Sequence, residues 1–185
     1  MDFNLDNLAE ELIAKRLGLV DYKKIIEAAE SADVSLENEA FQKVFNRFYV
    51  VRRNETWRGH FYKLFEENKN KSDVKFSDII HRLYADTGRV EASFASKMLA
   101  TLNTDMPIWD SKVLAKLKKK LDGKTGDERL DNAIALYDQI IAWYCKFLVS
   151  DDGKKCIAAF DDLLPQYNRL SNTKKIDFLL WASPE

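Results

Sequence analysis

Asp110 is the residue of this chain whose type and position best fit a chemical role. It stands in the segment PIWDSKVL, shortly after Pro107 and directly before a run of basic and apolar residues. Because proline cannot continue a helix, the chain must turn before Asp110, whose carboxylate can then accept the free backbone N–H of Lys112 or Val113. A carboxylate held beside lysines could stabilise positive charge on a substrate or activate a water molecule. It could equally be only a helix cap, worth about 1 kcal/mol of stability.

The other reactive side chains form no recognisable motif. His60 and His81 have no Cys, Asp or Glu three or four residues further on, so we expect no metal site. No nucleophile elbow, phosphate loop or dinucleotide fingerprint is present, and no cofactor is expected. Cys145 is expected to pack inside an apolar helix, whereas Cys156, which follows two lysines, is expected to be the more reactive thiol.

Helical periodicity recurs from end to end, and strand patterns are nearly absent. The sequence therefore predicts an all-α fold: a single compact domain of about ten helices over residues 1–185. Two lobes are possible, one formed by residues 1–75 plus the C-terminal helices and one by residues 77–149. Cap and breaker residues predict helices over about 5–17 (ended by Gly18), from Asp21, from Ser35, from Asn54, from Ser77 to Gly88, and over about 90–102, 111–121 and 128–149. Two final helices are centred on 157–164 and 176–181.

The helices around Asp110 should each bury one face. In the helix over 90–102, the apolar stripe of Val90, Phe94, Met98 and Leu102 leaves Lys97 and Thr101 facing outward. In the next helix, Val113, Leu114, Leu117 and Leu121 should be buried while the side chains at solvent are Lys112, Lys116 and Lys119. The long helix should turn inward Ile134, Tyr137, Ile141, Tyr144 and Leu148.

Charge is distributed unevenly along the chain, although the net charge is only −1. Residues 1–40 carry a net charge of −6, residues 41–120 of +8 and residues 121–185 of −3. A basic middle segment is typical of nucleic-acid binding, but it also fits an ordinary solvated face. Arg52, Arg53 and Arg58 lie around Trp57 in this segment. We expect Trp57 to be buried and the arginines to pair with acids such as Glu55.

The segment Trp109-Asp110-Ser111-Lys112-Val113 resembles the Val-Asp-Thr-His-Val motif of the helix-hairpin-helix (HhH-GPD) DNA glycosylase superfamily. The resemblance spans residues 77–121, with Gly88 at the place of the hairpin. It implies that Asp110 is the catalytic aspartate of a base-excision enzyme and that double-stranded DNA is the partner. The DNA-binding residues that it implies are Gly88, Arg89, Lys97, Ser111, Lys112 and Lys116.

The departures from that family refine the expectation. Lys112 replaces the histidine of the motif, only one hairpin glycine is present, and Glu91 would repel a phosphate at the hairpin. Ala92 and Ser93 occupy the region where bifunctional members carry a lysine, so any glycosylase activity should be monofunctional. The alternative is a non-enzymatic helical scaffold or protein-interaction module in which Asp110 is only a cap.

The composition bears on the compartment. No apolar run approaches the roughly 18 residues that span a bilayer, and no apolar leader opens the chain. With only two cysteines, which lack metal-ligand spacing, the chain is expected to be a cytoplasmic protein with reduced thiols.

Overall fold

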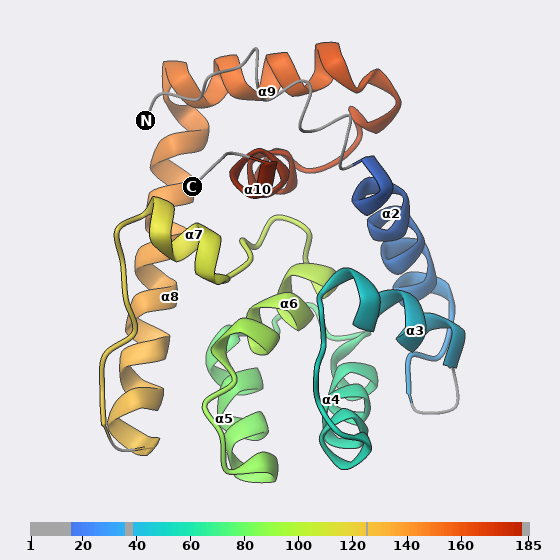
Figure 1. The fold of residues 1–185 in the computed structure, drawn as a ribbon, viewed down its shortest axis with the longest axis vertical. Helices are drawn as coiled ribbons and strands as arrows, with labels where there is room; N and C mark the ends of the chain where they lie inside the picture. The colour runs from blue at the N-terminus through green and yellow to red at the C-terminus, as the bar shows by residue number, and fades with distance from the viewer. Residues whose placement is uncertain (1–15, 36–38, 125, 183–185) are drawn as a thin grey trace.

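The computed structural model describes residues 16–35, 39–124 and 126–182, and within them the chain is helical with no strand, which confirms the all-α prediction (Figure 1). None of the described helices is long and apolar enough to cross a bilayer. The helices are α2 (Arg16–Ser31), α3 (Glu39–Phe48), α4 (Glu55–Asn68), α5 (Phe76–Thr87), α6 (Ala92–Leu102), α7 (Ser111–Lys116), α8 (Gly126–Val149), α9 (Asp151–Leu163), a short 3-10 turn (Pro165–Tyr167) and α10 (Asn172–Ala182).

Helix α6 is the most enclosed element of the fold. It contacts α2 and α5, and its buried residues are Ala92 and all those from Phe94 to Thr101. The long helix α8 runs along one edge of the molecule, α9 crosses one end, and α10 lies between α9 and the rest (Figure 1). Helix α10 contacts α7, α8 and α9, and so it holds α7 against the rest of the fold.

Several helix boundaries follow the predicted local rules. Asn54 caps α4 by accepting the Trp57 backbone N–H at 2.9 Å, and Gly88 ends α5 in the left-handed conformation with φ of 68°. Ser150 caps α9, whose first turn holds Asp151 and Asp152. The boundaries at Asn54 and Gly88 were predicted because a cap depends on residues within one turn of it, whereas the cap at Ser150 was not predicted.

Other predicted boundaries are wrong. Gly18 lies inside α2, which continues past it, and Asp21 is not a cap but pairs with Arg47 at 2.8 Å. Helix α5 begins at Phe76, so Ser77 is not its cap either. The part of the first predicted helix before residue 16 and the three residues that follow Ser35 lie outside the described residues.

The helix predicted over 111–121 is shorter than expected. It ends at Lys116 because Lys118 adopts the left-handed conformation, with φ of 52°, and its N–H bonds back to the Ala115 carbonyl. The chain then passes along α8, where the Lys119 ammonium donates to Gln139 Oε1. The prediction that Lys119 faces solvent on a helix is therefore wrong.

The buried face of α8 is also rotated from the predicted one. Tyr137 and Tyr144 are buried as expected, whereas Ile134, Ile141 and Leu148 are half-buried. The buried face is formed by Leu130, Ala133, Leu136, Tyr137, Ile140, Tyr144 and Phe147. Both cysteine predictions are reversed, since Cys145 is exposed and Cys156 is buried. Burial raises the pKa of the Cys156 thiol, which makes it a poor nucleophile.

Candidate functional site

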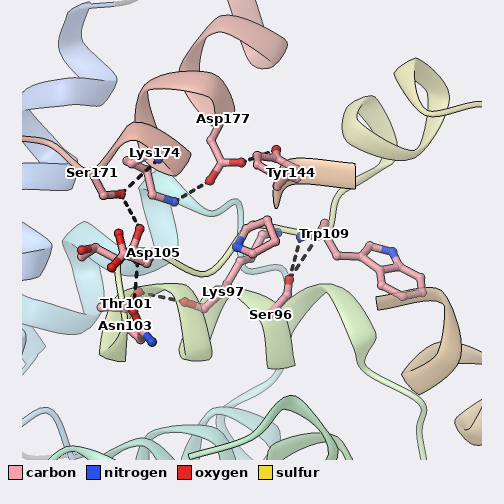
Figure 2. Close-up of polar contacts among 12 residues, drawn as sticks. Ser96, Lys97, Thr101, Asn103, Asp105, Trp109, Tyr144, Ser171, Lys174 and Asp177 are labelled. Atoms are coloured by element: carbon pink, nitrogen blue, oxygen red, sulfur yellow. Dashed lines mark hydrogen bonds and ion pairs between the residues drawn. The ribbon is translucent and has the colours of Figure 1, made fainter. Parts of the chain in front are cut away.

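The segment before Asp110 is fixed by buried hydrogen bonds from two helices. The Tyr137 hydroxyl of α8 donates to the Pro107 carbonyl at 2.7 Å. The Trp109 backbone N–H donates to Ser96 Oγ of α6 at 2.9 Å, as Figure 2 shows. Because both contacts are buried, the backbone that delivers Asp110 is held on both sides.

A buried ion pair supports the same segment from α10. Asp177 and Lys174 are only 1% and 2% exposed at their side chains, and their charged atoms lie 2.7 Å apart (Figure 2). The Tyr144 hydroxyl also donates to Asp177 at 2.6 Å, and the Ile108 backbone N–H hydrogen-bonds to the same carboxylate. Burial raises the pKa of the Asp177 carboxyl, and the ion pair with Lys174 opposes that change. The network ties α8 and α10 to the residue two positions before Asp110.

The Asp110 carboxylate caps α7, as predicted, and retains a second oxygen. Its Oδ1 accepts the Val113 backbone N–H at 2.8 Å. The other oxygen, Oδ2, accepts no hydrogen bond from any described residue. Because the Asp110 carboxylate is only half-buried, its Oδ2 can still bind a ligand or a water molecule.

Lys97 is buried, and the prediction that it faces outward is wrong. Its exposed fraction is 9%. Its ammonium lies 3.4 Å from the Tyr49 carbonyl oxygen, 5.7 Å from the Tyr49 ring centre and 5.1 Å from that of Phe94. Burial lowers the pKa of Lys97, and the negative charge of Asp110 partly opposes this. The turn after α3 covers this face of α6, and Thr101, also predicted to face outward, is buried as well.

Asp110 and Lys97 line one pocket of about 450 Å³. Two of its walls come from the segments that carry Asp110 and Lys97, and the others come from the end of α3 and from α10. Its complete lining is Phe48, Tyr49, Val50, Lys97, Asp110, Ser111, Lys112 and Trp181. Aromatic walls around a carboxylate and two ammonium groups suit a planar, polar ligand of the size of a nucleobase.

The structure brings together four of the seven predicted site residues, because Ser111 and Lys112 line the pocket with Asp110 and Lys97. Lys112 does not extend into solvent as predicted, since its half-buried ammonium donates to the Trp181 carbonyl at 3.1 Å.

The other three predicted residues lie elsewhere. Gly88 and Arg89 follow the end of α5, and Arg89 lines a second cleft. Lys116 is half-buried at the end of α7, again not at solvent as predicted, and lines neither pocket.

Four pocket residues were missed by sequence reasoning: Phe48, Tyr49, Val50 and Trp181. All four are apolar or aromatic residues of a kind that usually packs in a core, and nothing in the local sequence singles them out as pocket residues. Val50 has φ of 54° and is 57% exposed, a conformation that a β-branched residue rarely adopts.

Glu91, predicted to repel a phosphate, has its charge neutralised inside the protein. It is 6% exposed and accepts two hydrogen bonds of 3.0 Å from Arg53. Arg53 therefore does not pair with Glu55, as the sequence had suggested. This ion pair removes the electrostatic objection to an anion near the turn after α5.

Among the described residues, no three His, Cys, Asp or Glu side chains cluster so as to hold a metal ion. Comparison with protein-family models, with curated proteins and with solved structures finds no match to this chain. Function is therefore argued from the geometry of the pocket.

Proposed function

We propose that this protein is a monofunctional DNA N-glycosylase, in which the pocket receives one nucleotide turned out of a duplex. The observation that supports the proposal is that Asp110, whose Oδ1 alone is used by the helix cap, lines an aromatic-walled pocket together with buried Lys97. A scaffold would need Asp110 only as a cap and would need no buried lysine next to it. The +8 charge of residues 41–120 supports attraction to duplex DNA.

The aromatic side chains give the pocket a means of holding a base. Phe48 and Trp181 line the pocket and are half-buried, so a base can stack on one of these rings once it has left the duplex, while Tyr49 is buried behind them. A stacked base would place its sugar toward the polar side of the pocket, where Asp110 and Ser111 lie.

In the proposed reaction, the bond between the base nitrogen and the sugar C1′ breaks, and its electron pair leaves with the base. The Asp110 carboxylate stabilises the positive charge that develops on the sugar. A water oxygen then bonds to C1′, and Asp110 accepts the proton that this water releases. Lys97 supplies an N–H donor to the departing base, which carries the electron pair.

The test uses duplexes that each hold one damaged or mismatched base, with alkaline cleavage to detect abasic sites. Asp110→Asn should retain the cap, because asparagine caps helices as well as aspartate does, and should still bind DNA. Its excision rate should fall by about 10²–10⁴-fold. The matched control is Asp105→Asn, an exposed aspartate of the same loop that lies outside the pocket lining.

Three results would count against the proposal. Failure to bind any duplex at low salt would remove it, and so would binding without excision of any base in the panel, which is the behaviour of a scaffold. Equal excision by the wild type and Asp110→Asn would remove Asp110 from the chemistry. Borohydride is added in parallel, because a trapped imine on Lys97 would show attack by the amine instead of water.

A further inference from the structure

A second cleft, of about 360 Å³, lies between the start of α4 and the end of α5. Its cationic lining residues are Arg52 and Arg89, with Arg53 and His60 beside them. None of its lining residues lines the pocket that contains Asp110.

The cleft carries an excess of positive charge. Arg52 is exposed and forms no ion pair with any described acid. Arg89 lies 3.8 Å from Glu91, but that carboxylate is already engaged by Arg53. The one acid in the lining, Asp86, accepts a hydrogen bond of 2.9 Å from Arg82. Two guanidinium groups are therefore available to an anion.

The indole of Trp57 forms part of the wall of the cleft, so its signal can report a bound anion. Trp57 is only 6% exposed, and its Nε1 is buried, so the ring contacts the cleft without offering its N–H to a ligand. The first turn of α4, a 14-residue helix, also lines the cleft through Thr56, and the positive end of the helix dipole favours an anion there.

We propose that this cleft binds a phosphate group, with Arg52 and Arg89 holding its charge beside the first turn of α4. This inference rests on the proposed function, in which the phosphate belongs to the DNA strand whose nucleotide enters the pocket. Val50 of the pocket and Arg52 of the cleft are two residues apart, which is at most about 7 Å of chain. This short segment connects the linings of the two sites, and the phosphates that flank a nucleotide in the pocket are the ones that we expect the cleft to bind.

The experiment follows the indole N–H signals of the ¹⁵N-labelled protein, with Trp57→Phe to assign the signal of Trp57. One arm adds inorganic phosphate against chloride at equal ionic strength, and the other adds an undamaged duplex. Arg52→Gln is the test variant. Arg169→Gln is its control, because Arg169 is an exposed arginine outside the cleft lining.

Phosphate and duplex should both shift the Trp57 signal. Arg52→Gln should weaken duplex binding about tenfold and reduce the salt slope of affinity by about 1, as expected for one lost phosphate contact. The control should change neither.

The outcomes separate the two proposals. If the duplex binds without moving the Trp57 signal and Arg52→Gln binds like the wild type, the cleft is not a phosphate site and the glycosylase proposal stands. If phosphate moves the signal but no duplex binds, the glycosylase proposal fails and the cleft serves a free phosphate compound. If neither ligand moves the signal, the inference about the cleft is overturned.

Discussion

Replacing Lys97 with methionine should stabilise the protein while removing the proposed excision activity. The lysine is 9% exposed, and its ammonium has one long hydrogen bond, 3.4 Å, to the Tyr49 carbonyl. Taking an ion out of water costs several kcal/mol, and two cation–π contacts of about 0.5–2 kcal/mol each offset part of that. Methionine has a similar length, no charge, and contacts the same rings. We expect the substitution to raise the free energy of unfolding by about 1–2 kcal/mol, within the range for buried ions replaced by apolar side chains.

The pH dependence gives a second readout of the same charge. Burial lowers the pKa of Lys97 in the folded protein, while the unfolded value is about 10.4. Between these two values the unfolded chain holds a proton that the folded chain has lost, so the stability of the wild type rises with pH. The advantage of Lys97→Met should therefore shrink as the pH approaches about 10.4. Urea unfolding of both proteins at several pH values measures the difference, in which the titration of the tyrosines is common to both.

The matched control is Lys63→Met, which removes an exposed lysine of α4 and should change stability by less than about 0.5 kcal/mol. A Lys97→Met protein that is destabilised by more than about 1 kcal/mol and excises bases at the wild-type rate would refute the reasoning. Lys97 would then be a structural residue whose contacts outweigh its desolvation.

Two further predictions concern the groups that position Asp110. Ser96→Ala leaves the buried Trp109 N–H without its acceptor and should destabilise the protein by about 1–3 kcal/mol in urea unfolding; an unchanged midpoint would mean that water replaces the hydroxyl. Asp177→Leu leaves Lys174 as an unpaired buried charge and should cost about 3–5 kcal/mol, whereas adding Lys174→Met to it should restore most of the loss. A double-mutant cycle by chemical denaturation measures this coupling, and strictly additive losses would contradict it.

The sequence predicted the features that depend on local geometry. Asn54, Gly88 and Asp110 mark helix boundaries because each acts on backbone groups within one turn, so their types suffice. The prediction that Gly18 ends a helix was wrong because glycine permits a helix to end but does not require it. Helix α2 continues through Gly18 because the residues that follow it pack well.

The pocket required long-range information. The periodicity of α6 correctly predicts that Phe94 and Met98 are buried, whereas Val90 precedes the helix. It cannot show that the turn after α3 covers the opposite face and buries Lys97. Likewise, the residues next to Trp181 in the sequence are apolar and do not predict a pocket. Only the contact between α10 and α7 brings Trp181 next to Lys112. A buried lysine has no local signature, because the type of residue is the same as on a solvated face.

The distribution of unfavourable choices favours a binding or catalytic role over a scaffold. Helices α5 and α3 are each followed by a residue in the left-handed conformation. After α5 this residue is Gly88, which adopts the conformation without strain. At the end of α3 the same conformation falls on Val50, at a cost of about 1–2 kcal/mol, although its 57% exposure gives little burial in return. Lys97 is a second costly choice at the same pocket, because among the described residues its buried ammonium lacks the carboxylate partner that Lys174 has. Lys118, after α7, is also left-handed but lies outside the pocket lining. Strain and buried charge that persist together at one pocket are expected where ligand binding requires them, since a scaffold could replace both with stabilising residues.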